Sequence, residues 1–246
     1  MSHSESWLVN LAGDKHCSLS LICIPYAGGS ASAYGCWARH LPPHVRLLGL
    51  QLPGRGHRIG EPVIDDMQTL TATVGPLIAQ ADLGPFCFFG HSAGALMAFS
   101  LTTWLERHGQ RRPSKLLVSA SRAPRESCIP FHHLPNGPFR QCLAQFGGLP
   151  PEVATHEELM QLLMPAFRAD VRLAETYCSD ERTHCEIVAF GGTEDPHVST
   201  QSLRAWQAHT RSRFSLTFVP GGHFYIKDPV QALPYIAAEV TEPMSA

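Results

Sequence analysis

Ser92 lies in the segment GHSAG, which fits the pattern Gly-x-Ser-x-Gly at residues 90–94. A short apolar run, residues 86–89, precedes the motif, and a helix-compatible stretch, residues 93–109, overlaps its end. This order of strand, sharp turn and helix is typical of a nucleophile elbow, in which a strained turn lifts the serine hydroxyl clear of a sheet. Glycine neighbours suit the turn because larger side chains would clash there. The sequence therefore predicts that Ser92 is a nucleophile.

A serine hydroxyl is a weak nucleophile, so it needs a base, and the base needs an acid that orients it. In proteins with such an elbow, the acid and then a histidine base follow the serine along the chain. His223 is the last histidine of the sequence, and it follows the apolar run 216–219 and a Pro-Gly-Gly turn. We therefore expect His223 to accept the proton of Ser92.

Asp195 is the candidate acid. It follows the apolar run 186–190 and precedes Pro196, which favours an extended turn that can aim the carboxylate. We expect it to fix the tautomer of the histidine base and to stabilise the protonated ring. Glu194 and Asp180 lie in the same part of the chain and are the competing candidates.

Stabilisation of a developing oxyanion requires backbone N–H donors near the serine. One donor is expected at Ala93, at the start of a helix whose dipole favours negative charge. The second should come from the loop after an earlier strand, and the segment ICIPYAGGSASAY at residues 22–34 fits that loop. Gly28 and Gly29 allow its backbone to approach a substrate closely, so we nominate the amide of Ala27.

Alternating strands and helices would have to position these residues. Continuous apolar runs suit strands that are buried on both faces of a parallel sheet, and they occur at residues 19–24, 45–50, 86–89, 115–120, 186–190 and 216–219. Helix-compatible stretches lie between or after them, at residues 93–109, 199–210 and 229–240, the last interrupted by Pro234. The alternation predicts an α/β fold with a mostly parallel central sheet flanked by helices.

Residues 125–177 break this alternation because they contain no convincing strand. Two helical stretches are separated by a diglycine at 147–148 and a diproline at 150–151. The second begins with THEE, a capping-box pattern with Thr155 as N-cap and Glu158 three residues later. We expect this helical insertion to be a lid, because long insertions in compact domains are usually functional; ordinary packing helices are the alternative.

The composition favours a single domain spanning residues 1–246, with 44% hydrophobic residues and a net charge of −2. The charges are scattered, so no basic face indicates nucleic acid or an anionic membrane surface as a partner. Eight cysteines without a C-x-x-C pair, no signal pattern and no long apolar window favour a cytoplasmic protein with reduced thiols. The fourteen histidines show no metal-binding spacing, and we expect no metal site.

Taken together, five segments resemble type II thioesterases of the α/β-hydrolase superfamily: PYAGGSASAY, LQLPGRGHR, FFGHSAGAL, MPAFRADVRLAETY and VPGGHFYI. These are the stand-alone enzymes that accompany modular polyketide synthases and nonribosomal peptide synthetases. The resemblance covers about residues 16–240. It implies an α/β-hydrolase fold and one set of site residues: Ser92 as nucleophile, Asp195 as acid, His223 as base, and the amides of Ala27 and Ala93 as the oxyanion hole.

The resemblance also implies a substrate class. Such enzymes hydrolyse acyl or aminoacyl thioesters from the phosphopantetheine arm of carrier proteins, clearing stalled or misloaded groups from siderophore, antibiotic and similar assembly lines. They often work as monomers, and no cofactor is implied because the substrate itself carries phosphopantetheine. The helical insertion would shape the acyl channel. Arg55 of the PGRG stretch either meets a phosphate or the carrier's acidic surface, or is a solvated residue of a structural turn.

Two other functions are compatible with the sequence. A general carboxylesterase or an acyltransferase would use the same Ser-His-Asp arrangement, because fold and triad alone do not select the substrate. A non-catalytic protein that docks on a synthetase would keep the hydrolase fold without using it. The intact set of three candidate residues argues against the second of these alternatives.

Overall fold

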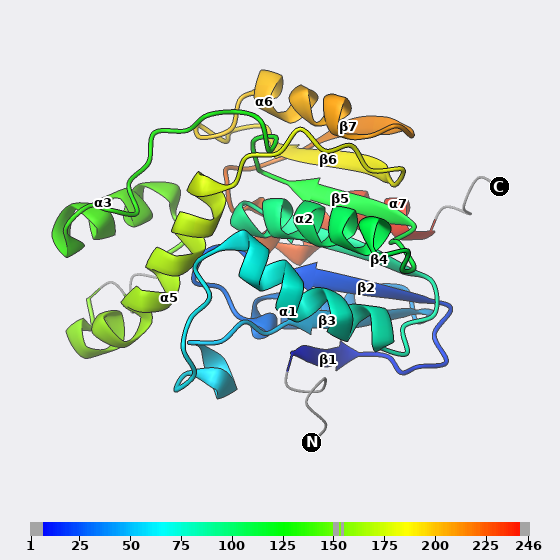
Figure 1. Ribbon diagram of the computed structural model, residues 1–246, viewed down its shortest axis with the longest axis horizontal. Helices are drawn as coiled ribbons and strands as arrows, with labels where there is room; N and C mark the ends of the chain where they lie inside the picture. The colour runs from blue at the N-terminus through cyan, green and yellow to red at the C-terminus, as the bar shows by residue number, and fades with distance from the viewer. Residues whose placement is uncertain (1–6, 150–152, 154, 242–246) are drawn as a thin grey trace.

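The computed structural model describes residues 7–149, 153 and 155–241, and the statements below concern these residues. A seven-stranded sheet crosses the molecule in the order β1-β3-β2-β4-β5-β6-β7 (Figure 1). β1 pairs antiparallel with β3, and the other five pairings are parallel. The strands are β1 (Leu8–Ala12), β2 (Leu19–Ile24), β3 (Val45–Leu50), β4 (Phe86–His91), β5 (Lys115–Ser119), β6 (Glu186–Gly192) and β7 (Phe214–Val219).

The six strands predicted from continuous apolar runs are confirmed, and the burial of the inner strands shows why such runs form them. In β2, Leu21 and Cys23 enter the core on one face of the sheet, whereas Ile22 and Ile24 enter it on the other. A strand covered on both faces needs apolar side chains at every position. β1 was missed because it is an edge strand without a fully buried residue, and the exposed Asn10 interrupts its short apolar run.

Helices cover both faces of the sheet. α1 (Met67–Gln80) and α2 (Ala93–Arg107) pack on one face, and η1 (Ala31–Arg39) and α7 (Pro229–Thr241) pack on the other. The predicted helix at 199–210 forms as the short α6 (Thr200–Arg204), which continues as the 3₁₀-helix η3 (Ala205–His209). Two further 3₁₀ turns are η2 (Gly56–Arg58) and η4 (Tyr225–Lys227).

The predicted interruption of the last helix at Pro234 is wrong. α7 runs through this residue, although a proline removes one backbone hydrogen bond from a helix. Leu233, directly before Pro234, and Ile236, two residues after it, are fully buried against the sheet. Burial of this face outweighs the lost bond, so tertiary packing overrides the local preference.

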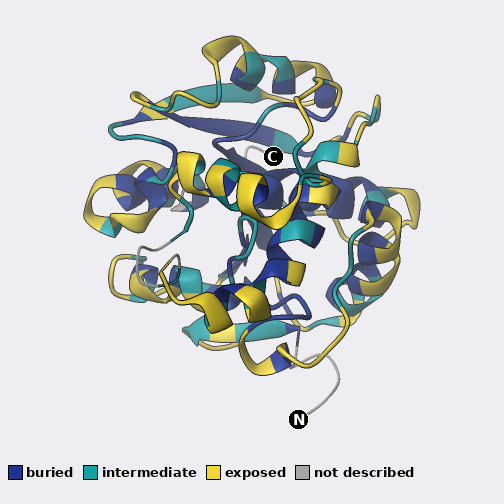
Figure 2. Cartoon of the chain, turned by 90° about the vertical axis from the view of Figure 1, so that its left-hand side faces the viewer, coloured by how far each residue is buried: buried dark blue, intermediate teal, exposed yellow. Residues whose placement is uncertain are grey.

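The helical insertion contains α3 (Asn136–Phe146) and α5 (Glu157–Thr176), which lie together to one side of the sheet (Figure 1). Figure 2 looks onto this side and shows strands buried inside and helices exposed on their outer faces. The two helices share an apolar cluster of their own: Phe139, Leu143, Met160, Met164, Phe167 and Val171. The separation of two helical stretches by the diglycine is confirmed, because Gly147 ends α3 in a left-handed conformation.

The expected capping box at the start of α5 is wrong. His156, not Thr155, is the N-cap, and its side chain accepts a hydrogen bond from the N–H of Leu159. The helix therefore begins one residue later than the THEE pattern suggests. The diproline at 150–151 lies outside the described residues.

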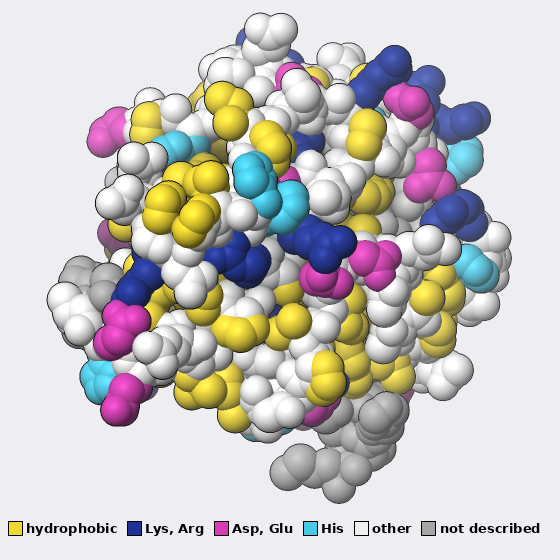
Figure 3. Space-filling model, turned by 60° about the vertical axis from the view of Figure 1, so that its left-hand side comes forward, with side chains coloured by type: hydrophobic (Ala, Val, Ile, Leu, Met, Phe, Trp, Pro, Cys, Tyr) yellow, Lys and Arg dark blue, Asp and Glu magenta, His cyan; other side chains and the backbone are white. Residues whose placement is uncertain are grey.

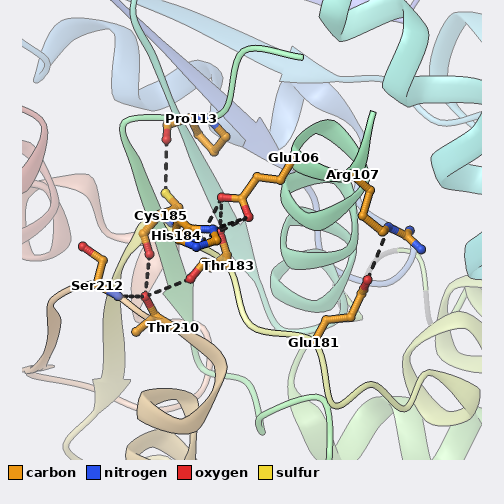
Figure 4. Close-up of polar contacts among 9 residues, drawn as sticks. All are labelled: Glu106, Arg107, Pro113, Glu181, Thr183, His184, Cys185, Thr210 and Ser212. Carbon is orange, nitrogen blue, oxygen red and sulfur yellow. Dashed lines mark hydrogen bonds and ion pairs between the residues drawn. The ribbon is translucent and has the colours of Figure 1, made fainter. Parts of the chain in front are cut away.

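After α5, the chain returns to the sheet along the C-terminal end of α2 (Figure 4). The Glu106 carboxylate accepts hydrogen bonds from the hydroxyl of Thr183 at 2.6 Å and from the N–H of His184 at 3.0 Å. Nearby, Arg107 and Glu181 form an exposed ion pair at 3.3 Å. These contacts hold the segment that leads from the insertion into β6.

Candidate active site

Ser92 occupies the turn between β4 and α2, as expected for a nucleophile elbow. Its φ of 54° and ψ of −120° are unusual for a residue with a side chain. Among the described residues other than glycine, only Ser92 and Ala120 have a positive φ. The Ser92 N–H donates to the carbonyl of Ser119 on β5 at 2.8 Å, so the neighbouring strand holds the strained turn in place.

The two glycines of the motif are required by close backbone contacts. A Cβ atom at Gly90 would lie 2.2 Å from the carbonyl oxygen of Gly94. A Cβ atom at Gly94 would lie 2.3 Å from the carbonyl oxygen of Ile24 on β2. Any other residue at either position would push the helix away from the sheet. The glycines therefore allow α2 to begin directly against the strands.

His223 and Asp195 form a hydrogen-bonded pair, with 2.8 Å between Nδ1 of the imidazole and Oδ2 of the carboxylate. They lie on the loops that follow β7 and β6, which are neighbours in the sheet. Both side chains are almost fully buried. Burial raises the pKa of Asp195, but the hydrogen bond and charge of His223 and the N–H of His197 outweigh this effect, so the pKa lies below its usual value.

The two competing acids lie elsewhere. The backbone N–H of Glu194 donates to the carbonyl of Gly221, while its side chain is exposed. Asp180 pairs with Arg125 at 3.0 Å, and both side chains are about three-quarters exposed. Asp195 is thus the candidate acid that contacts the candidate base.

Ser92 and the candidate base face the same cavity of about 870 Å³. Its walls come from the elbow, the loop after β2, the loop after β6 and the helical insertion, including Phe146 and Phe167. Among the described residues, Nε2 of His223 has no hydrogen-bond partner, so this atom can accept a proton within the site. The face of the molecule that carries α3 and α5 exposes apolar side chains interspersed with histidine, basic and acidic ones (Figure 3).

The two nominated oxyanion donors also border this cavity. Ala93 is 5% exposed and is the first residue of α2, so its N–H lies at the positive end of the helix dipole. Ala27 follows β2 and precedes Gly28, whose φ of 73° only glycine adopts readily. A Cβ atom at Gly28 would lie 2.0 Å from the ring of Phe167 on α5. The loop therefore fits tightly beneath the insertion.

Arg55 differs from both sequence-based expectations. It is 2% exposed and makes a two-pronged ion pair with Asp170 on α5, so it is neither solvated nor presented to a phosphate or a carrier surface. Arg55 also donates to the carbonyl of Gly29, and Asp170 accepts from the N–H of Gly28. Sequence reasoning missed Asp170. Its only signal in the sequence was its place in the MPAFRADVRLAETY segment.

A second buried polar chain lies beneath His223. Nδ1 of His91 is 2.8 Å from the hydroxyl of Ser119, which is 2.5 Å from the hydroxyl of Tyr225. The rings of His91 and His223 are 5.3 Å apart. Burial holds the pKa of His91 well below its usual value, and the nearby His223 adds to the effect. His91 is therefore a neutral support for the site.

Among the residues that the structure describes, no group of three or more His, Cys, Asp or Glu side chains could hold a metal ion. All eight cysteines lie within these residues and are free thiols. None of the helices described is both long enough and apolar enough to cross a membrane.

A mostly parallel sheet with a serine at the turn from strand to helix, and a His-Asp pair on later loops, defines an α/β-hydrolase. Within that class, the model of the thioesterase domain family matches residues 20–240, and the chain belongs to this family. It is 37% identical to the gramicidin S biosynthesis protein GrsT of Aneurinibacillus migulanus, over 92% of this chain and 90% of that protein.

Solved structures show the same likeness. The type II thioesterase BorB from the borrelidin biosynthetic cluster is 35% identical, with a TM-score of 0.84 over 97% of this chain and 99% of BorB. The RedJ thioesterase from the prodiginine biosynthetic pathway in Streptomyces coelicolor is 31% identical, with a TM-score of 0.84 over 93% of each chain. The expected family and fold are thereby confirmed.

Proposed function

We propose that this protein is an editing thioesterase that hydrolyses acyl or aminoacyl thioesters from phosphopantetheinylated carrier proteins of nonribosomal peptide or polyketide assembly lines. One observation carries the proposal: in a chain of the thioesterase family, the strained Ser92 borders one cavity together with His223, which is hydrogen-bonded to Asp195. The names of GrsT and BorB, which refer to gramicidin S and borrelidin biosynthesis, support the pathway class.

The reaction proceeds through an acyl-enzyme. Nε2 of His223 takes the proton of Ser92 while the serine oxygen attacks the thioester carbonyl, and the tetrahedral oxyanion is held by the amides of Ala27 and Ala93. The protonated His223 then gives its proton to the departing thiol of phosphopantetheine. Water, activated by the same histidine, releases the acyl group, and Asp195 stabilises the imidazolium in both steps.

In this proposal the chain is a single domain, and its helical insertion is the lid of the cavity. Its residues form one wall of the cavity, and a volume of about 870 Å³ is large enough for an acyl chain together with part of the phosphopantetheine arm. The partner is a carrier protein domain, and the enzyme acts as a cytoplasmic monomer without a metal or other cofactor. The free thiols fit a reducing compartment.

Replacement of Ser92 by alanine tests the proposal. We expect kcat for an acyl-carrier thioester to fall by about 10⁶-fold, because nucleophile and base act as one unit, while the melting temperature stays within a few degrees. Mass spectrometry of the unaltered protein, after mixing with the acyl-carrier thioester, should detect an acyl adduct on Ser92. Full activity of S92A would overturn the catalytic role and leave a docking protein as the better explanation.

The substrate class is tested by comparing an acyl-carrier thioester with a p-nitrophenyl ester of the same chain length. A thioesterase should have the higher kcat/KM for the carrier thioester. A strong preference for the simple ester would instead identify a general carboxylesterase. Transfer of the acyl group to an added alcohol or amine in preference to water would identify an acyltransferase.

A further inference from the structure

The geometry points to Asp170 and Arg55 as positioning residues for the oxyanion hole, through which α5 fixes the loop that presents the Ala27 amide. This inference rests on the proposed function, since it assigns Ala27 the role of oxyanion donor. Asp170 is 0% exposed and lies on the insertion, 115 residues along the chain from Arg55. The two residues therefore join α5 to the loop after β3.

Asp170 holds the residue that follows Ala27. Its Oδ2 accepts from the N–H of Gly28 at 2.8 Å and also from Arg55, while Oδ1 accepts from the second guanidinium nitrogen at 2.9 Å. The next amide, of Gly29, is engaged with the carbonyl of Tyr26 at 2.8 Å. Because both following amides are committed to fixed acceptors, the Ala27 amide has a defined direction.

Arg55 holds the same loop from its other end. Its guanidinium donates to the carbonyl of Gly29 at 3.3 Å. Gln51 extends this network, because its side chain donates to the carbonyl of Arg55 at 2.9 Å and accepts from the N–H of Ala31 at 3.1 Å. The loop from Tyr26 to Ala31 is thereby fixed to both α5 and the PGRG turn.

Stability alone is a poor reason for such a pair. A buried ion pair often contributes little net stability, because the desolvation of both charges offsets their attraction. An oxyanion hole, in contrast, depends on donors that are already oriented before the charge develops. The same helix also lines the cavity through Phe167 and Val171, one turn before Asp170 and directly after it. The surface that touches the acyl group and the side chain that orients the oxyanion loop therefore belong to one rigid element.

Two variants separate positioning from folding. Asp170→Asn removes the charge, whereas the double variant Arg55→Met/Asp170→Leu removes both buried charges and leaves none unpaired, which preserves folding best. Arg172→Gln is the matched control, because Arg172 also ties α5 to the body of the protein, through Asp65, but touches no part of the oxyanion loop.

Each variant is assayed per active site, after titration with a fluorophosphonate, on an acyl-N-acetylcysteamine thioester. We expect kcat to fall about 10- to 100-fold in both Asp170 variants, and KM to stay within about threefold of the original value. This fall in kcat should not exceed the fall caused by removing a whole oxyanion donor. R172Q should keep the original kcat. A trifluoromethyl ketone of the same chain length, which forms an oxyanion on Ser92, should lose affinity by the same factor as kcat/KM. The corresponding alcohol, which forms none, should bind unchanged.

An unchanged kcat per active site with a lower melting temperature would overturn the inference, as would equal losses of affinity for the ketone and the alcohol. These outcomes leave the proposed function intact as long as S92A is inactive. Hydrolysis by S92A at the rate of the original protein would instead refute the proposed function itself.

Discussion

The imidazole of His197 lies stacked on the ring of Phe146, with 4.2 Å between the ring centroids and 25° between the planes. His197 follows the candidate acid by two residues, and Phe146 is the last residue of α3. Nε2 of His197 also lies 3.0 Å from the carbonyl of Gln145, and the ring of Phe146 is 5.6 Å from that of His223. The C-terminal end of α3 thus packs directly against the loops that carry the candidate acid and base.

This contact predicts that Phe146 governs acyl-chain selectivity. Phe146→Ala should widen the cavity and change the ratio of kcat/KM for long and short acyl thioesters by about 10-fold or more, since burial of each methylene group contributes about 0.8 kcal/mol. Labelling of Ser92 by a small fluorophosphonate should change less than threefold. Leu162→Ala, at an exposed position of α5, is the control. Unchanged selectivity would count against the proposed lid.

The adjoining diglycine, Gly147 and Gly148, is also expected to influence acyl-chain selectivity. A Cβ atom at Gly148 would lie 2.8 Å from the ring of Phe224, beside the candidate base. Shortening the chain here should therefore alter acyl-chain selectivity more than it alters the reactivity of Ser92 toward the fluorophosphonate.

Asp195→Asn should lower kcat by about 10⁴-fold, because the amide favours the wrong tautomer of His223. The folded protein should remain intact in circular dichroism. Glu194→Gln is the matched control, since it changes the adjacent exposed carboxylate. A larger loss of activity in E194Q than in D195N would mean that the acid has been assigned to the wrong residue.

The buried His91 predicts a specific pH dependence of stability. Its pKa in the folded protein lies below the unfolded value of about 6.5, so the unfolded chain takes up a proton that the folded chain refuses. The resulting stability is present above pH 6.5 and is lost as the pH falls. From pH 7.5 to 5.5, this histidine should reduce the free energy of unfolding by up to about 1.4 kcal/mol. Burial shifts the pKa of His209 in the same direction.

Urea titrations at pH 5.5, 6.5 and 7.5 measure this effect. In His91→Gln, the fall in unfolding free energy over this range should be smaller by the contribution of one proton, even if the variant is less stable at every pH. An identical pH dependence in H91Q and the original protein would exclude His91 as its source.

Glu106 predicts a structural effect without a catalytic one. Glu106→Ala leaves the Thr183 hydroxyl and the His184 N–H without their acceptor, which should lower the free energy of unfolding by about 1–3 kcal/mol while kcat per active site stays the same (Figure 4). Glu181→Ala breaks only the exposed pair with Arg107 and should change stability by less than about 1 kcal/mol. Equal losses of unfolding free energy in the two variants, measured by urea titration, would contradict the structural role of Glu106.

The core of the fold and the candidate triad could be predicted because they depend on local signals. A parallel strand buried on both faces, such as β4 or β6, is apolar at nearly every position, and Ser92 and Asp195 lie at or soon after the ends of these two strands. His223 follows the edge strand β7, which is only partly buried but keeps a recognisable apolar run. The strained turn at Ser92 is likewise indicated in the sequence by the two glycines of the motif. The structure brings His223 and Asp195 into contact in the expected way, while their catalytic roles remain predictions.

Features that depend on distant partners could not be predicted in this way. The burial of Arg55 follows from a carboxylate 115 residues further along the chain, and nothing within the PGRG stretch indicates that partner. The continuation of α7 through Pro234 depends on packing against the sheet. At the start of α5, two adjacent residues could both cap the helix, and the local pattern favoured Thr155 over His156.

The direct pairing of β5 with β6 has a consequence for chimaeric enzymes. Because Ser119 lies opposite Phe190, the helical insertion leaves and rejoins the sheet on adjacent strands, and exchanging it between relatives requires only two neighbouring junctions. Asp170 travels with such a cassette, whereas Arg55 stays with the recipient. A transplanted cassette without an acidic residue at this position of its helix would leave a buried guanidinium without its counterion. Compatibility between donor and recipient is therefore decided by one charge pair as well as by the junctions.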